Sequence, residues 1–194
     1  MKQNRPRVPK GVRDQVMNEY NHLCAICGEP RPQLHHIDED HTNNDPLNLL
    51  PLCPNHHLTD QHNPTSKIDP GILSLFRHHK DPTILSPQFE PLFRRMQFLL
   101  DRSKQDGVAA HNQGKDLVAF ISALHMSEYY YEAVNKLLFE QFTNPEAPTG
   151  GSIHLIHRLA IGTKETRRTA VDLIIEMLRY QSWNQTPNKL RKHP

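Results

Sequence analysis

The sequence predicts an α+β protein in which a small ββα module is followed by a mostly α-helical domain. Three observations predict it. Cysteine and histidine recur at short, paired spacings between residues 24 and 57. Two short segments of β character, residues 33–37 and 48–52, lie between those pairs. From residue 69 onward, amphipathic segments with helical periodicity alternate with breaks rich in proline and glycine. We therefore expect two domains, residues 1–64 and residues 65–194.

The first element of the module is a predicted helix over residues 9–21. Pro9 suits the start of a helix, and Val12, Val16 and Tyr20 fall on one face at i, i+4 and i+8. Gly28 follows the first cysteine pair, where a tight turn needs an unhindered backbone. The helix is therefore expected to lead directly into the cysteine-containing turn.

The remaining elements of the module are two strands and a short helix. Residues 33–37 form the first predicted strand, residues 38–46 a polar loop, and residues 48–52 the return strand. A short helix over residues 54–62 opens with Pro54. Because adjacent side chains on a strand point to opposite faces, His35 and His36 are not equivalent.

Four side chains have the spacing of a zinc site. Cys24 and Cys27 form a C-x2-C pair, and Cys53 and His56 form a C-x2-H pair. Thiolate and imidazole are the ligands that structural Zn²⁺ takes, and four of them close a tetrahedron. A redox role for the C-x2-C pair is the alternative, but no βαβ pattern surrounds it.

The cysteine content and the N-terminus indicate the compartment. Three cysteines and a basic N-terminus without an apolar run behind it argue against a disulfide framework and a signal peptide. No sequence window has the apolar length of a membrane span. The sequence therefore predicts a cytoplasmic protein that does not enter a membrane.

The second domain is predicted to be helical. The first expected helix begins at Asp69-Pro70, and the next covers residues 88–102. Residues 116–125 and 127–142 form two further helices or one kinked helix. Residues 153–161 form another helix, and Thr163 caps the last one, which runs to Arg179. Residues 63–66 are a predicted linker, residues 80–87 and 143–151 are predicted breaks, and residues 186–194 are a predicted basic tail.

Net charge alone does not indicate a nucleic-acid-binding protein. The chain carries +2 with a pI of about 8.5. Residues 1–64 hold six Lys/Arg and eight Asp/Glu, so this part is negative before any metal binds. If a polyanion binds there, metal ions and the later helices must help to hold it.

The order of these motifs resembles the HNH endonucleases, the ββα-metal nucleases, in their zinc-stapled form. The resemblance covers residues 8–62 and rests on C-x2-C, the strand ending in His35-His36, the loop with Asn48, and C-x2-H followed at once by His57. The replacement of a fourth cysteine by His56 departs from the commonest pattern but keeps a good zinc ligand.

The resemblance implies a role for each residue. His36 would be the general base that activates water, and Asn48 would hold the loop and orient that base. His35 and His57 would ligate a catalytic divalent cation. Two protein ligands leave positions for water and phosphate oxygens, which suits Mg²⁺, although two imidazoles also suit Mn²⁺, Ni²⁺ or Zn²⁺.

Some relatives carry another metal ligand one helical turn after the last histidine. Gln61 occupies that place here, because residues i and i+4 share a helix face. His62 lies about 140° from that face by helical geometry and is a further possible ligand or phosphate contact. The acidic side chains of the 38–46 loop could also ligate metal, with solvated loop charges as the alternative.

The resemblance therefore implies a metal-dependent endonuclease that hydrolyses phosphodiester bonds, with DNA as the expected substrate and RNA as a possible one. A weaker resemblance, in size and layout, is to the HNH subunit of Septu-type and retron-associated antiphage systems, which works with an ATPase partner. Two alternatives stay open. One is a stand-alone restriction or homing-type nuclease, and the other is a catalytically inert zinc-stapled nucleic-acid-binding module.

Overall fold

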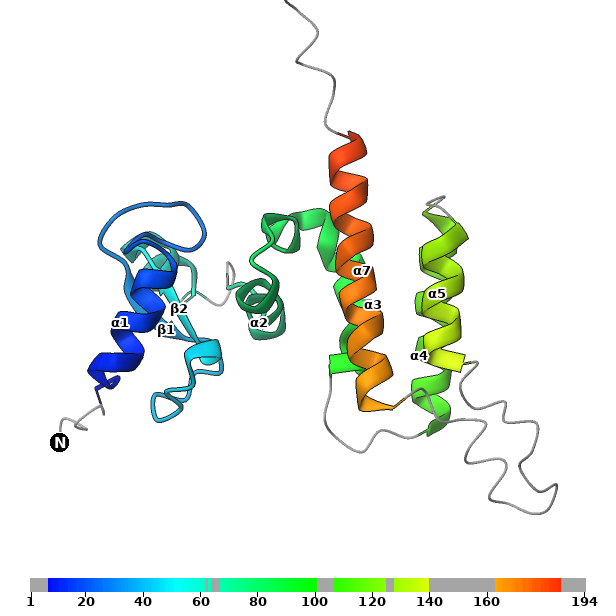
Figure 1. Ribbon diagram of the computed structural model, residues 1–194, viewed down its shortest axis with the longest axis horizontal. Helices are drawn as coiled ribbons and strands as arrows, with labels where there is room; N and C mark the ends of the chain where they lie inside the picture. The colour runs from blue at the N-terminus through cyan, green and yellow to red at the C-terminus, as the bar shows by residue number, and fades with distance from the viewer. Residues whose placement is uncertain are drawn as a thin grey trace, which may run out of the picture. The chain divides into compact units, whose positions relative to one another are not determined.

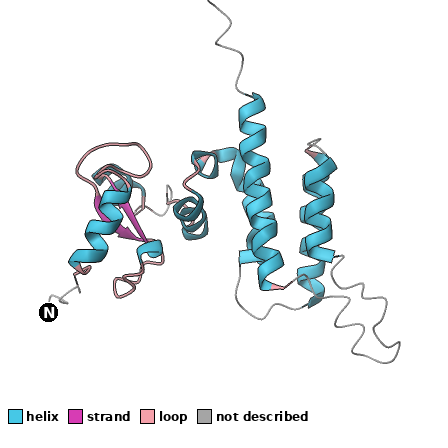
Figure 2. Ribbon diagram, viewed as in Figure 1, coloured by secondary structure: helices cyan, strands magenta, loops and turns pink. Residues whose placement is uncertain are grey.

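The computed structural model describes residues 7–61, 63, 67–100, 107–124, 128–139 and 163–185, and the chain separates into two compact units. The first unit is Met1–Leu85 and the second is Ser86–Pro194. The predicted helix over residues 153–161 and the predicted tail over residues 186–194 lie outside the described residues. Figures 1 and 2 show the helices and strands of each unit.

The first unit is built on a two-stranded antiparallel sheet. Strand β1 (Gln33–His36) pairs with β2 (Leu49–Leu52), so that Gln33 lies opposite Leu52 and His36 opposite Leu49. Helix α1 (Lys10–Glu19) packs on β2 through Val16, which is fully buried. All four residues of β2 are buried, so this strand forms the centre of the unit's small core.

The turn that carries the first two cysteines joins α1 to the sheet. The backbone of Gly28 has a φ of +75°, a left-handed conformation that favours glycine, as the sequence predicted. The Cys24 N–H donates to the Glu29 carbonyl, and the Ala25 N–H donates to the carbonyl of Pro51 in β2, each over 2.8 Å. The cysteine turn is therefore held against the outer edge of the sheet.

The short helix after β2 is wound more loosely than an α-helix. This segment, η2 (Asn55–Asp60), is a π-helix, and the Gln61 N–H donates to the His56 carbonyl five residues earlier. At its start the His57 N–H donates to the Cys53 carbonyl at 2.8 Å. The predicted helix over residues 54–62 is present in its described part. A sequence pattern does not distinguish π-winding from α-winding, and π-winding is common at functional sites.

Helix α2 (Pro70–His79) belongs to the first unit. Its Asp69 N-cap accepts from the Gly71 N–H at 2.7 Å, and it packs on the 3-10 turn η1 (Pro46–Asn48) and on the 3-10 turn η3 (Pro82–Leu85). The division of the chain into two compact units falls after Leu85, so α2 lies in the first unit.

Arg77 anchors α2 to the rest of the first unit. Its side chain is only 2% exposed, and its guanidinium donates to the Glu19 carboxylate at 2.6 and 3.1 Å. It also donates to two backbone carbonyls, that of Pro46 at 3.0 Å and that of Leu49 at 2.9 Å. A charged side chain is buried in this way only when it is paired, so Arg77 joins α1, η1 and β2 at one point.

The second unit consists of helices in its described part. The 3-10 turn η4 (Pro87–Phe89) leads into α3 (Glu90–Leu100), and α4 (Gly107–Ala123), α5 (Glu128–Phe139) and α7 (Lys164–Gln185) follow. Helix α3 contacts α4 and α7, and α5 contacts α4 and α7. The shared core is formed mainly by aliphatic and aromatic side chains, namely Phe89, Leu92, Phe93, Met96, Leu117, Ile121, Val134, Leu138, Val171, Ile174 and Ile175.

The prediction of an α+β, mostly helical chain with a small sheet is confirmed. Helix α4 begins nine residues before its predicted start, and α7 ends six residues beyond its predicted end. Thr163 caps α7, since its hydroxyl accepts from the Thr166 N–H at 3.2 Å. Within the described residues, none of the helices combines the length and apolar character needed to cross a membrane.

Candidate metal centres and histidine site

The four predicted zinc ligands converge in space. The ligand atoms of Cys24, Cys27, Cys53 and His56 all lie within 4.8 Å of one another. Cys27 Sγ and Cys53 Sγ are 3.7 Å apart, and His56 Nδ1 lies 3.5 Å from Cys24 Sγ and 3.3 Å from Cys53 Sγ. This cluster could bind a metal ion such as zinc.

The spacing fits a tetrahedral zinc site. With Zn–S near 2.3 Å and Zn–N near 2.05 Å, a tetrahedron places two sulfurs about 3.8 Å apart and a sulfur and a nitrogen about 3.6 Å apart. The three observed separations lie within about 0.3 Å of these edges. We therefore read the contacts as edges of one coordination polyhedron rather than as separate hydrogen bonds.

The thiols of the cluster differ in their acidity. Burial raises the pKa of the Cys24 thiol. Hydrogen bonds from the backbone N–H groups of Cys27, Cys53 and Ile26 and from the His56 side chain outweigh burial and lower this pKa to about 6. Burial and the neighbouring cysteines raise the pKa of Cys27 to about 11. Without a cation, Cys24 is therefore the first of the two thiols to ionise, and its negative charge disfavours ionisation of Cys27. A bound cation would relieve this repulsion and release protons.

One face of β1 carries Gln33 and His35, because alternate residues of a strand share a face. His57, from η2, contacts both. Its ring centre is 5.4 Å from that of His35 with the planes at 73°, and its Nδ1 lies 3.1 Å from Gln33 Oε1. Two imidazoles that share an ion at 90–110°, with metal–nitrogen bonds of about 2.1 Å, have ring centres roughly 4.7–5.4 Å apart. The observed separation of the rings lies at the upper end of this range, and the resemblance to HNH endonucleases implies a shared cation for this pair.

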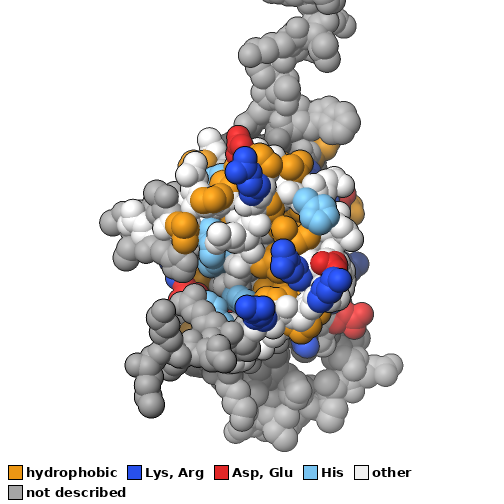
Figure 3. Space-filling model, turned by 90° about the vertical axis from the view of Figure 1, so that its left-hand side faces the viewer, with side chains coloured by type: hydrophobic (Ala, Val, Ile, Leu, Met, Phe, Trp, Pro, Cys, Tyr) orange, Lys and Arg blue, Asp and Glu red, His pale blue; other side chains and the backbone are white. Residues whose placement is uncertain are grey.

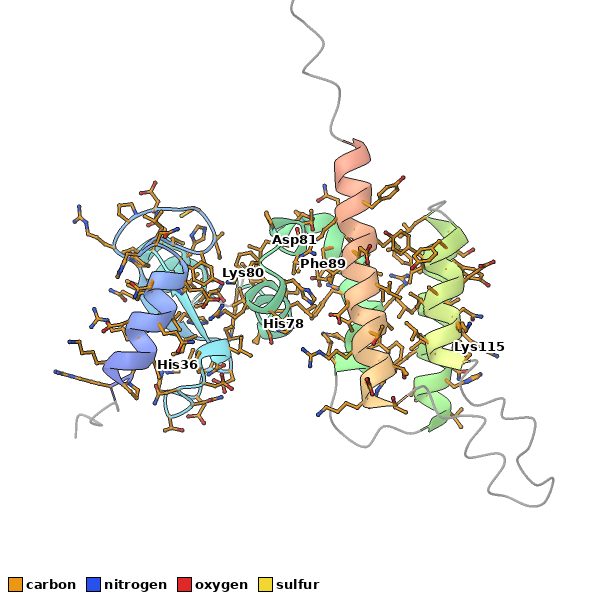
Figure 4. The ribbon with its side chains drawn as sticks, viewed as in Figure 1. His36, His78, Lys80, Asp81, Phe89 and Lys115 are labelled. Carbon is orange, nitrogen blue, oxygen red and sulfur yellow. The ribbon has the colours of Figure 1, made fainter. Side chains whose placement is uncertain are left out.

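His36 points to the other face of β1 and lies beside the loop that follows the strand (Figure 4). It is 8% exposed, and its Nε2 is buried without a hydrogen-bond partner among the described residues. The ring of His41, an exposed loop residue, lies edge-on to it with ring centres 5.3 Å apart. A buried imidazole nitrogen without a partner is costly, at about 1–3 kcal/mol, unless it serves a bound molecule.

Asn48 holds the loop between the strands. Its side-chain oxygen accepts from the Asp38 N–H at 3.1 Å, and its amide donates to Asp38 Oδ1 at 2.8 Å and to the Asn43 carbonyl at 3.0 Å. The Ile37 N–H donates to the Asn48 carbonyl at 2.9 Å. Asn48 thus ties the start and the middle of the loop that follows His36 to its end.

Asp38 is the acidic centre of this loop. Partial burial raises its pKa, but hydrogen bonds from the side chains of Asn43 and Asn48 and from the Asp40 N–H outweigh it, so the pKa of Asp38 is lowered. These bonds occupy both oxygens of the carboxylate. The structure therefore gives Asp38 the role of organising the loop.

Gln61 lies at the end of η2 and is 4% exposed. Neither its side-chain oxygen nor its side-chain nitrogen has a hydrogen-bond partner among the described residues. Buried amides are nearly always hydrogen-bonded, so this one is suited to an additional ligand such as a cation or a bound water. His62, the other possible additional ligand, lies outside the described residues.

Three residues near these sites were not identified from the sequence. Gln33 contacts His57, His41 contacts His36, and Arg77 donates to the carbonyls on either side of Asn48. Strand alternation could have placed Gln33 beside His35, whereas the contacts of His41 and Arg77 depend on the folded loop and on α2.

Comparisons of the chain with family models, with curated proteins and with solved structures find no match.

Proposed function

We propose that the first unit is a metal-dependent nuclease of the HNH type that hydrolyses phosphodiester bonds of nucleic acid, with DNA as the first candidate substrate. The observation that carries this proposal is the placement of the histidines. His35 and His57 pair on one face of β1, and His36 lies on the other face beside the loop that Asn48 holds. The ββα-metal arrangement would be formed by β1, β2 and η2.

Phosphodiester hydrolysis requires a deprotonated water and neutralisation of charge on the phosphate and on the leaving oxygen. A divalent cation held by His35 and His57 would supply that neutralisation when bound, and Gln61 is suited to complete its protein ligands. His36 would take the proton from the attacking water at a ring nitrogen. Asn48 would keep the loop, and with it the strand end, in position for that transfer.

The Cys24, Cys27, Cys53 and His56 cluster would hold zinc in a structural role. Four protein ligands close a tetrahedron and leave no open position for substrate. In this proposal zinc fixes the turn before β1 and the start of η2, and thereby the backbone of His57.

The charge distribution supports binding through the site rather than through a general basic surface. On the face shown in Figure 3, Lys and Arg side chains are dispersed among hydrophobic and histidine side chains and form no single continuous patch. Three basic residues of the first unit, Lys67, Arg77 and Lys80, pair with acidic ones. Affinity for a polyanion would therefore depend strongly on the cation in the site.

The helical second unit would dock a protein partner, and an ATPase is the partner class that the Septu-type layout suggests. Tyr129 and Tyr180 are 63% and 54% exposed on α5 and α7, which contact each other. Exposed tyrosines are enriched at protein interfaces. Cutting that begins only when such a partner is added would support a gated effector, whereas sequence-specific cutting by the chain alone would favour a stand-alone nuclease.

The test is cleavage of supercoiled plasmid DNA and of total RNA by the zinc-loaded chain, with and without added Mg²⁺ or Mn²⁺. We expect cutting that requires the added cation and falls about 10²–10⁴-fold in His36→Ala. Gln15→Ala, at an exposed position of α1 away from the histidines, is the control and should cut at the wild-type rate. Equal cutting by His36→Ala and the wild type would refute the proposal. Binding of nucleic acid without any cutting would identify an inert binding module.

A further inference from the structure

Gln33 lies on β1 and contacts His57, the histidine of the His35–His57 pair that comes from η2. Gln33 and His35 lie on the same face of β1, and the His57 ring meets both from η2. The contact of Gln33 is a hydrogen bond between its Oε1 and His57 Nδ1 over 3.1 Å. The two strand residues thus approach the same imidazole in different ways, one by its ring and one by its amide oxygen.

The chemistry of this hydrogen bond determines the form of the ring. An amide oxygen can only accept, so His57 Nδ1 must carry the hydrogen. In the neutral imidazole, Nε2 then holds the lone pair, and a metal ion binds an imidazole through a lone pair. Metal-binding histidines commonly donate their other ring N–H to an oxygen in this manner, which fixes both the tautomer and the ring orientation.

The backbone of His57 is held separately from its ring. Its N–H donates to the Cys53 carbonyl at 2.8 Å, next to the cysteine cluster. That bond leaves rotation about the side-chain torsions undetermined. Gln33 adds a constraint on the ring from β1, where it pairs with Leu52, the residue before Cys53.

We propose that Gln33 is a positioning residue that holds His57 in the Nδ1–H tautomer, so that His57 and His35 together can bind a divalent cation. This inference rests on the proposed function, because it concerns the same cation. Gln33 does not itself touch the cation or the substrate in this scheme.

The experiment uses the zinc-loaded full chain and measures Mn²⁺ binding by calorimetry in three variants. Gln33→Leu removes the acceptor, Gln33→Glu keeps one, and Gln15→Leu makes the same change at an exposed position of α1. We expect Mn²⁺ affinity to fall about 10–100-fold in Gln33→Leu and to stay within a few-fold of wild type in Gln33→Glu. Gln15→Leu should match the wild type.

A spectroscopic measurement distinguishes a positioning role of Gln33 from a merely structural one. Long-range ¹H–¹⁵N spectra without Mn²⁺ should show His57 in the Nδ1–H tautomer in the wild type and in Gln33→Glu, and a mixture of tautomers in Gln33→Leu. Zinc content should be about one per chain in all variants. If Gln33→Leu loses its zinc, two measurements still test the proposal, namely the tautomer of His57 in the wild type and the Mn²⁺ affinity of Gln33→Glu.

The outcomes distinguish this inference from the proposed function. A wild-type chain that binds no Mn²⁺ would overturn both. Wild-type binding that Gln33→Leu reproduces would overturn the role of Gln33 alone and leave the nuclease proposal standing. His57 found in the Nε2–H tautomer in the wild type would also overturn the role of Gln33.

Discussion

Replacement of Arg77 by alanine should destabilise the first unit by about 3 kcal/mol. Removing one partner of a buried ion pair typically costs about 3–5 kcal/mol, because the other charge and its hydrogen-bond partners are left unpaired. The Glu19 side chain is 29% exposed and can be partly resolvated, so the lower end of this range applies. A loss of this size changes the ratio of folded to unfolded molecules by about 10²-fold.

The two units allow this effect to be localised. Most of the described helical residues lie in α3, α4, α5 and α7, so far-ultraviolet circular dichroism mainly follows the second unit. Zinc release to a chromogenic chelator during urea unfolding follows the cysteine cluster in the first. With a urea dependence of about 1–3 kcal/mol/M, the zinc-release midpoint should fall by roughly 1–3 M in Arg77→Ala. The main circular-dichroism transition should stay in place.

Arg13→Ala is the matched control, because Arg13 is exposed on α1 and its loss should change stability by less than about 0.5 kcal/mol. Because Arg77 donates to the carbonyls on either side of Asn48, Arg77→Ala should also disturb the loop after His36. A zinc-release midpoint equal to that of the wild type would show that the guanidinium does not anchor α2, and the reasoning from burial would fail.

Three further outcomes are expected. The pKa of Glu19 is lowered from 4.5 to about 2, chiefly by its hydrogen bond to Arg77, so its contribution is present above about pH 4.5 and is lost as the pH falls toward 2. The stability difference between wild type and Glu19→Gln should therefore shrink by roughly 0.5–1 kcal/mol between pH 7 and pH 4, and a constant difference in urea midpoints would contradict this. Cys53→Ser should lower the zinc content measured by mass spectrometry from about one per chain toward zero, since a neutral hydroxyl is a poor zinc ligand; full retention of zinc would exclude Cys53 as a ligand. A fragment of residues 1–85 should give dispersed NMR spectra with zinc, whereas residues 1–64, without the buried face of α2, should not; a folded 1–64 fragment would show that α2 is dispensable.

The sequence was most informative where residue chemistry and spacing act locally. The ligand spacing of Cys24, Cys27, Cys53 and His56 predicted a cluster that the structure assembles. The unhindered backbone predicted at Gly28 agrees with its positive φ in the turn. Strand alternation predicted that His35 and His36 point to opposite faces. The roles assigned to the histidines in catalysis stay predictions.

Features that depend on tertiary packing could not be predicted in this way. The charge of Arg77 indicates a surface residue, and its burial is possible only because Glu19 and two carbonyls, distant in the sequence, surround it. The first turns of α4 contain Gly107 and Gly114, which lower intrinsic helix propensity, yet α4 packs between α3 and α5. The π-winding of η2 likewise reflects local hydrogen-bond geometry that no hydrophobic pattern records.

His56 and His57 are consecutive residues that serve different clusters, and this adjacency couples the two mechanically. If the four-ligand cluster holds zinc as proposed, a change in metal–ligand bond length there would be transmitted through a single peptide unit to the imidazole that faces His35. Cadmium, which shares zinc's preference for sulfur but has a larger radius, should therefore leave the fold intact while it shifts the second ring. Exchange of the ion in the four-ligand cluster would then alter the proposed cation site at His35 and His57 without changing any of that site's own side chains.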